Sequence, residues 1–147
     1  MKKLLVSLMF FLVTSVLQAS EIVVSPSCRF ASLVLTENEY AQWDDSLFET
    51  YTQKIYEKFN DDFDFIVFVL NEPTKPAKYT YYGINYLVSA QESGIGLESS
   101  FDNTQYYGSA GRLQSVIHLP MSNGIAYGPF LHEIEHRWAN YAFPSIN

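Results

Sequence analysis

The stretch FDFIVFVL, residues 63–70, is almost continuously apolar and rich in branched and aromatic side chains. A strand with one solvated face alternates apolar and polar residues, whereas an unbroken apolar run of this length is typical of a strand buried on both faces. We therefore predict that residues 63–70 form a central strand of the fold. Asp61 and Asp62 precede this strand, and a proline-containing loop at residues 71–77 follows it.

The segment before this strand predicts a helix over residues 45–59. Its apolar side chains recur at helical spacing and form one face; they are Leu47, Phe48, Tyr51, Ile55, Tyr56 and Phe59. Asp44 or Asp45 is expected to cap the first turn, where a carboxylate also interacts favourably with the helix dipole. Residues 36–39, Thr-Glu-Asn-Glu, have capping character and predict a helical turn further upstream.

Several other segments have the composition of strands, namely residues 22–24, 30–35, 81–88 and 112–119. An irregular, glycine-containing connection is expected between the last two. A helix is predicted to begin at Gly128-Pro129, since proline favours the first helical position, and to end at Pro144. The predicted fold class is α+β, with a mixed β-sheet, a backing helix and a C-terminal helix packed on the sheet.

The C-terminal stretch GPFLHEIEHRWANYAFPSIN, residues 128–147, places two histidines one helical turn apart. Positions 132 and 136 differ by only about 40° around a helix axis, so both imidazoles reach one point in space. This spacing predicts that His132 and His136 bind zinc, and that the carboxylate of Glu133 acts as general base on an attacking water. The apolar residues expected to dock this helix on the sheet are Leu131, Ile134, Trp138 and Tyr141.

The pattern His132-Glu133-x-x-His136, continued by Arg137 and Trp138, resembles the zincin superfamily of metallopeptidases and, within it, a group of secreted bacterial metalloproteases. The resemblance implies a zincin-like N-terminal subdomain, in which the lowest strand of the sheet lines the substrate cleft above the active-site helix. Residues 112–119 are the expected cleft strand, to which an extended peptide would pair. It also implies a hydrolase with Zn²⁺ as cofactor and a peptide or protein as substrate.

Two features depart from the zincin pattern. Ala139 and Ala142 stand where metzincins carry glycine and histidine, which excludes that subclass. Glu135 stands where zincins usually carry an uncharged residue. Its carboxylate is expected to hydrogen-bond an imidazole, to pair with Arg137 or another basic group, or to face water.

A catalytic zinc ion takes three protein ligands and keeps a fourth position for water. Only eleven residues follow His136, and His118 is the one other histidine, in an apolar strand where a structural role is expected. Weaker candidates are the carboxylates of Asp61, Asp62, Asp64 and Asp102. We therefore expect the third ligand beyond residue 147, which makes residues 20–147 the N-terminal part of an incomplete metallopeptidase domain. Cys28 is expected to be a small buried hydrophobe or to pair outside this sequence.

Residues 1–19 predict a signal peptide. A basic start at residues 1–3 precedes an apolar run at residues 4–17 and a cleavage-like site at residues 18–20. The apolar run is shorter than the roughly 20 residues that a spanning helix needs. Cleavage after Ala19 predicts a secreted or periplasmic protein without a stable membrane span, and an uncleaved N-terminal anchor is the alternative.

The charge of the mature segment argues against nucleic acid as a partner. Loss of Lys2 and Lys3 from the 9 basic residues leaves 7 against 16 acidic residues, a net charge of −9. Such a surface repels phosphate backbones. Nucleophilic catalysis also lacks support, because Cys28 has no positioned base and no G-x-S-x-G elbow is present.

A secreted zinc metallopeptidase is the favoured hypothesis, and two alternatives remain open. One is an exported binding module for peptide or glycan, suggested by the aromatic side chains of Tyr79, Tyr81, Tyr82, Tyr86, Tyr106 and Tyr107. Tyrosines that alternate along a strand more often pack in a core. The other is a zincin-derived domain that has lost catalysis, with Glu135 as its mark.

Overall fold

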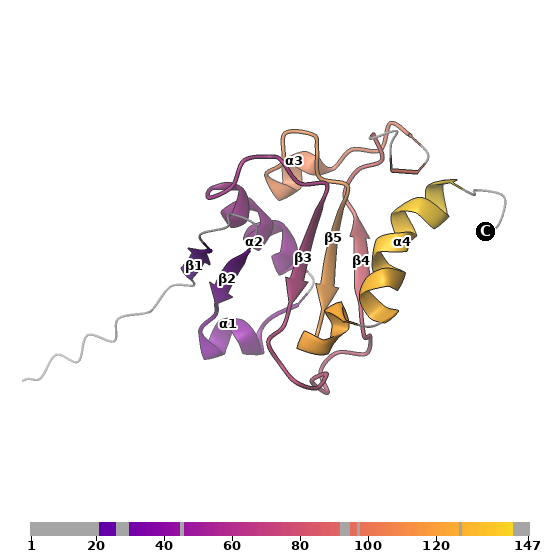
Figure 1. The fold of residues 1–147 in the computed structure, drawn as a ribbon. Coiled ribbons are helices and arrows are strands. Elements are labelled where there is room, and N and C mark those ends of the chain that lie inside the picture. Colours follow the sequence, from indigo (N-terminus) through magenta and orange to yellow (C-terminus); the bar gives the residue numbers. More distant parts are fainter. Residues whose placement is uncertain are drawn as a thin grey trace, which may run out of the picture.

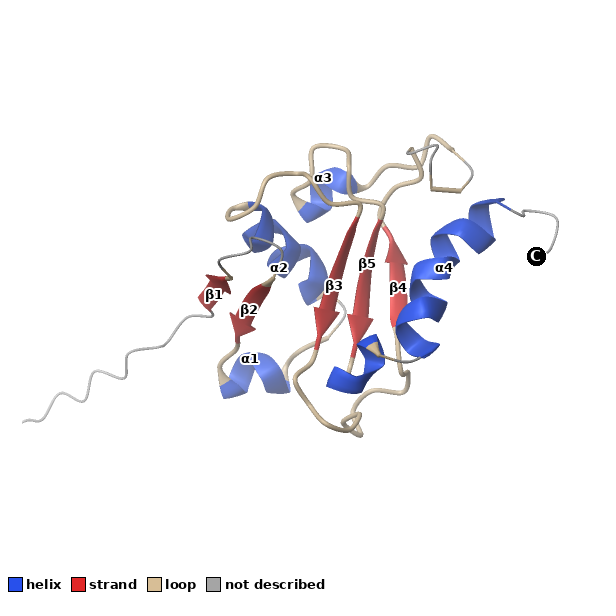
Figure 2. Cartoon of the chain, in the orientation of Figure 1, coloured by secondary structure: helices blue, strands red, loops and turns tan. Residues whose placement is uncertain are grey.

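The structure is a computed structural model and describes residues 21–25, 30–44, 46–91, 95–96, 98–126 and 128–142. The predicted signal peptide, Cys28 and Pro144 lie outside these residues. The described residues form an α+β fold with two sheets and four α-helices (Figure 2). None of the described helices is long and apolar enough to cross a membrane.

The elements follow one another in the predicted general order, with bounds shorter than the sequence patterns (Figure 1). They are β1 (Glu21–Val24), β2 (Ala31–Val34), α1 (Glu37–Ala41), α2 (Leu47–Tyr56), β3 (Phe65–Val69), β4 (Ile84–Leu87), α3 (Thr104–Tyr107), β5 (Ser115–Leu119), the 3₁₀ helix η1 (Ser122–Ile125) and α4 (Gly128–Ala142).

The larger sheet has the strand order β3-β5-β4. β3 runs parallel to β5, with Phe65 opposite Ser115, and β4 runs antiparallel to β5, with Leu87 opposite the same serine. The prediction of a mixed sheet is confirmed. The prediction that residues 63–70 form its central strand is wrong, because β5 lies in the middle and β3 at an edge. A continuous apolar run indicates that both faces of a strand are covered and carries no information about pairing along its edges.

α2 and the segment before it bury the core on one face of this sheet. Phe48 and Tyr51 of α2 pack with Ile66 of β3 and Val116 of β5, as the helical spacing of the apolar residues predicts. The buried cluster consists of Trp43, Phe48, Tyr51, Ile66, Tyr79, Val88, Tyr107, Leu113 and Val116. Burial of this apolar surface is the main favourable contribution to the stability of the fold.

The starts of the two N-terminal helices differ in how they are capped. Thr36 and Glu39 form a reciprocal capping box at α1, which confirms the capping character of this segment. α2 has no side-chain cap: Asp44 instead accepts a hydrogen bond from the backbone N–H of Ser46, at 2.9 Å. Asp45, the other predicted cap, lies outside the described residues.

α4 covers the opposite face of the sheet, beside β4 and β5 (Figure 1). Trp138 stacks on Phe65 with 5.6 Å between the ring centroids, and Nδ2 of Asn85 donates to the carbonyl of Glu133 at 2.7 Å. The predicted start of this helix at Gly128 is confirmed. The side chains that point from α4 toward the sheet therefore lie within reach of β4, at one edge of the fold.

β1 and β2 form a separate antiparallel hairpin next to β3 (Figure 1). Leu33 and Leu35 pack against the core cluster. No strand pairing joins the hairpin to the larger sheet within the described ranges. Packing of these leucines therefore helps to hold the hairpin against the core.

Candidate metal centre

The chain enters α4 through η1, directly after β5. Pro129 is the second residue of the helix, where its missing N–H removes no intrahelical hydrogen bond. The helix then continues without interruption to Ala142, which places His132 and His136 one turn apart as the sequence predicts.

The candidate ligand atoms of His132, Glu133 and His136 lie within 4.8 Å of one another. The two imidazole rings meet edge to face, with 4.7 Å between centroids and an interplanar angle of 81°. Nε2 of His136 lies 3.6 Å from Oε2 of Glu133. Imidazole nitrogen and carboxylate oxygen are ligands that zinc and related divalent ions accept. This set of donors therefore fits a divalent metal ion.

Glu133 is held more tightly than the two histidines. It is only 6% exposed, whereas His132 is exposed and His136 half-buried. A Cβ atom at Gly83 would lie 2.7 Å from Cγ of Glu133, so the space for this side chain exists because position 83 is a glycine. Asn85 binds the carbonyl of the same glutamate. The start of β4 thus fixes the position of the Glu133 carboxylate.

Arg137 is the second charged residue that α4 buries, with 1% of its surface exposed. Its Nε and Nη2 atoms donate to Oε1 of Gln114, at 3.4 and 3.2 Å. Gln114 in turn donates to Oγ of Ser89 and to the carbonyl of Arg112. A buried guanidinium needs such partners because the loss of water is costly for a charged group. This network ties α4 to the segment that leads into β5.

The connection after β4 also approaches Arg137. Gly96 has a φ of 79°, a left-handed conformation that glycine adopts without strain. A Cβ atom on Gly96 would lie 2.7 Å from the carbonyl oxygen of Arg137 and 2.9 Å from its Nη1 atom. The glycine therefore allows the connection to pass directly over the last turns of α4.

His118 is not part of the centre. It is almost completely buried on the α2 face of the sheet, where its Nδ1 atom is 2.9 Å from the hydroxyl oxygen of Tyr81. Trp43, Phe48 and Tyr79 surround the ring at centroid distances of 5.2 to 6.1 Å. The expected structural role of His118 is confirmed.

The upstream carboxylates that were candidate ligands make structural contacts elsewhere. Asp61 accepts from Oγ of Ser109 and from the backbone N–H of Ala110. Asp64 pairs with Arg112 at 3.2 Å. Asp102 accepts a hydrogen bond from the backbone N–H of Thr104, the first residue of α3, and Asp62 is exposed. Among the described residues, no third histidine and no further carboxylate joins the group on α4.

The prediction that the apolar residues of α4 dock on the sheet is wrong in part. Trp138 stacks on Phe65 of β3, as predicted, and is 39% exposed. Leu131 is 59% exposed, whereas Glu133 and Arg137 are buried. The sheet offers space for Glu133 at Gly83 and a hydrogen-bond partner for Arg137 in Gln114. The face of the helix that carries these two residues is therefore turned toward the sheet. Ile134 is half-buried. The side chain of Tyr141 lies outside the described part of the chain.

Glu135 faces solvent. It is exposed, and no hydrogen bond or ion pair joins its side chain to the described residues. Arg137, one of its expected partners, instead binds Gln114. Of the three expectations for this carboxylate, contact with water is the one that the structure bears out.

Most of the tyrosines in the middle of the chain pack in the interior. Tyr79 and Tyr107 belong to the buried core, and Tyr81 and Tyr86 pack against it. Tyr82 and Tyr106 are exposed. The six rings therefore do not form one aromatic surface, and they give no support to the binding-module alternative.

The sequence does not single out three residues that position the centre, namely Gly83, Asn85 and Gln114. They lie far from α4 along the chain, and no local spacing links them to the histidines. The one signal is the glycine that interrupts the predicted strand at residues 81–88, because such a glycine often marks the close approach of another segment.

The sheet edge next to the centre belongs to β4. β5 pairs with strands on both sides, so the prediction that residues 112–119 line a substrate cleft is wrong. The N–H of Val88 donates to the carbonyl of Gln114. Because backbone groups alternate in direction along a strand, Asn85 and Leu87 present theirs to the outer edge. β4 has no strand partner there among the described residues.

Comparison of the chain with protein-family models, with curated proteins and with solved structures gave no match.

Proposed function

We propose that this protein is an exported, zinc-dependent peptidase of the zincin type. The observation that carries the proposal is the cluster of His132, Glu133 and His136 on α4, next to the outer edge of β4. His132 and His136 would hold the ion through imidazole nitrogens. The sequence resemblance to zincins supports the same roles, because their active-site helix also follows a sheet.

The proposed reaction is hydrolysis of a peptide bond. A bound zinc ion would polarise the scissile carbonyl group and make water nucleophilic near neutral pH. Glu133 accepts a proton from the water molecule while the water oxygen forms a bond to the carbonyl carbon. The carboxylic acid then gives this proton to the leaving amine as the carbon–nitrogen bond breaks. Confinement of the side chain between α4 and Gly83 keeps the carboxylate in one orientation for both transfers.

β4 is the element proposed to orient the substrate. An extended peptide would add to its outer edge and exchange hydrogen bonds with the backbone of Asn85 and Leu87. Main-chain hydrogen bonds do not distinguish one side chain from another, so this contact would hold many sequences in the same orientation relative to Glu133.

The decisive experiment replaces Glu133 by glutamine and measures hydrolysis of fluorescein-labelled casein together with the zinc content of the purified chain. We expect Glu133→Gln to lower the rate by about 100-fold or more, because the amide cannot accept the proton. Zinc content should stay close to that of the unchanged protein, since both imidazoles remain. The matched control is Glu135→Gln, which alters an exposed neighbour and should change neither quantity.

Three results would contradict the proposal. If activity survives Glu133→Gln, Glu133 is not the general base. Loss of zinc in this variant would make Glu133 a ligand instead. If the protein without substitutions binds zinc at His132 and His136 but shows no chelator-sensitive hydrolysis, the alternative of a zincin-derived domain that has lost catalysis is favoured.

A further inference from the structure

We propose that the cleft between β2 and β3 binds an extended apolar peptide as an added β-strand, with a basic residue of that peptide next to Glu72. The cleft has a volume of about 690 Å³, which lies within the range of about 300–1,000 Å³ that is usual for ligand pockets. β3 and β5 separate it from β4, so it is distinct from the candidate metal centre. It is lined along its length by residues 31–35 and 65–72.

One wall of the cleft is the outer edge of β3. The carbonyl of Asp64 accepts from Gln114, and the N–H of Leu70 donates to Leu119, so the even-numbered residues of this strand bond toward β5. Backbone groups alternate in direction along a strand. Phe65, Val67 and Val69 therefore present their N–H and carbonyl groups to the cleft.

The facing wall is the outer edge of β2. The N–H of Ser25 donates to the carbonyl of Phe30, and the register of the hairpin then places the groups of Ser32 and Val34 toward β1. Ala31 and Leu33 consequently present theirs away from β1, toward the cleft. An edge of this kind is a template for a further strand.

A strand in the cleft would be paired on both sides. β2 and β3 point in the same direction in Figure 1, so one peptide can run antiparallel to both of them. It would join the two sheets into one. An isolated two-stranded hairpin is only marginally stable in water, so the same step would also give β1 and β2 the strand partner that they lack in the larger sheet.

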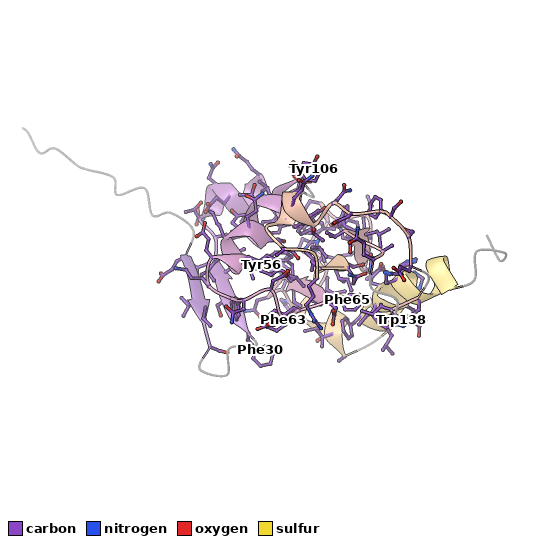
Figure 3. All side chains as sticks on the ribbon, turned by 90° about the horizontal axis from the view of Figure 1, so that it is seen from above. Phe30, Tyr56, Phe63, Phe65, Tyr106 and Trp138 are labelled. Atoms are coloured by element: carbon purple, nitrogen blue, oxygen red, sulfur yellow. The ribbon has the colours of Figure 1, made fainter. Side chains whose placement is uncertain are left out.

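The side chains of the cleft select an apolar occupant. Ile55, Phe59 and Trp43 line it on the helical side, and the indole N–H of Trp43 has no hydrogen-bond partner among the described residues. Figure 3 shows Phe30, Phe63 and Phe65 along one side of the molecule, and the last two of these also line the cleft. Phe30 is 71% exposed. Every second residue of an added strand would therefore meet apolar and aromatic surface.

The charge of Glu72 indicates where a basic group of the occupant belongs. Among the described residues that line the cleft, Glu72 is the only one with a charged side chain, and the whole chain carries a net charge of −7. The hydroxyl of Tyr40 donates to Glu72 at 3.5 Å, and burial together with the Glu72 charge raises the pKa of this phenol. Because β3 runs toward Glu72, an antiparallel peptide begins there. Its basic group belongs at its amino end.

The test uses a capped peptide, Lys-Val-Thr-Val-Thr-Val, with a fluorophore on a C-terminal linker, and follows its anisotropy with the intact chain in EDTA. The chelator prevents metal-dependent cleavage, so the result is independent of the proposed peptidase activity. We expect saturable binding that weakens at least tenfold when every second backbone nitrogen of the peptide is methylated. Such methylation leaves the apolar side chains in place. It removes N–H donors and adds a methyl group on that edge, and both changes prevent strand addition.

Hydrogen exchange locates the peptide without any substitution. The amides of Phe65, Val67 and Val69 should gain protection on binding, while those of Asn85 and Leu87 should not change. As a variant, Ala31→Pro removes one N–H that points to the cleft with little change in side-chain size, and should weaken binding. Glu72→Gln should weaken binding of the lysine peptide but not of its norleucine analogue, and His132→Ala should have no effect.

The proposal is overturned by any of three outcomes. These are no saturable binding up to millimolar peptide, equal affinity of the methylated and unmethylated peptides, or protection at Asn85 and Leu87 in place of β3. The last outcome would assign the peptide to the β4 edge, which belongs to the proposed peptidase site.

Discussion

The two faces of the β3-β5-β4 sheet bury different kinds of side chain. On the α2 face, Phe48 and Tyr51 pack in a cluster of mainly apolar and aromatic residues. On the α4 face, the helix buries Glu133 and Arg137 and leaves Leu131 in solvent. The first arrangement maximises apolar burial. The second gives up some of this stabilisation and places a carboxylate in a fixed position beside two histidines.

The histidines of the two faces show the same division. His118 lies among aromatic rings and binds Tyr81, so its imidazole is part of the core. His132 is exposed and His136 half-buried on α4, where their rings are accessible to a metal ion. Residue type alone therefore does not identify a ligand, because the packing around each ring decides what it can bind.

Phe48→Ala should have the largest effect on stability. The side chain is completely enclosed on the α2 face, and its removal leaves a cavity that costs about 3–5 kcal/mol of unfolding free energy. Urea denaturation followed by circular dichroism measures the change. A loss below about 1 kcal/mol would show that the two faces do not differ in the way described.

Arg137→Met should cost less, by about 1–3 kcal/mol, because Oε1 of Gln114 loses a buried donor. The double variant with Gln114→Leu should be less destabilised than the sum of the single changes, since it also removes the acceptor. The same urea titrations supply this cycle. Strict additivity would mean that the two side chains contribute independently and that the α4 face does not depend on their contact.

Tyr81→Phe separates the two kinds of histidine. It removes the hydroxyl that bonds His118 and should lower the unfolding free energy by about 0.5–1.5 kcal/mol. Zinc content should not change. His132→Ala should have the opposite pattern: zinc content should be lost, while the unfolding free energy of the metal-free protein should stay nearly the same. Zinc loss in Tyr81→Phe would contradict the assignment of His118 to the core alone.

Leu131→Ala should have the smallest effect, within about 0.5 kcal/mol, because most of this side chain is in water. A core position on an amphipathic helix would instead cost about 2–5 kcal/mol. Thermal denaturation of the variant next to Phe48→Ala compares the two faces directly.

Local features of the fold could be predicted from the sequence. The apolar spacing of α2, the capping box at Thr36 and the proline-led start of α4 all depend on neighbours within one or two turns. The spacing of His132 and His136 is local as well, so their proximity follows once the helix forms.

Features that depend on distant segments could not be predicted. β5 is the central strand of the sheet in place of the predicted β3. Strand order depends on pairing between distant segments, about which an apolar run carries no information. The burial of Glu133 depends on Gly83, and that of Arg137 on Gln114, both far along the chain. Helical periodicity alone assigns Leu131 to the interior because it counts hydrophobicity and ignores polar partners on the facing sheet.

The parallel pairing of β3 with β5 also bears on how the chain folds. Phe65 pairs with Ser115, which lies 50 positions later in the sequence, so this pair forms only after a long segment has closed on itself. β4 completes its own ladder on β5 and must wait for the same strand. Asp61 accepts hydrogen bonds from the backbone N–H groups of Ala110 and Arg112, and so joins the two ends of this long segment, just before β3 and just before β5. Folding should therefore be slow for a chain of this size, and a nascent chain cannot assemble its sheet until residue 119 has left the ribosome.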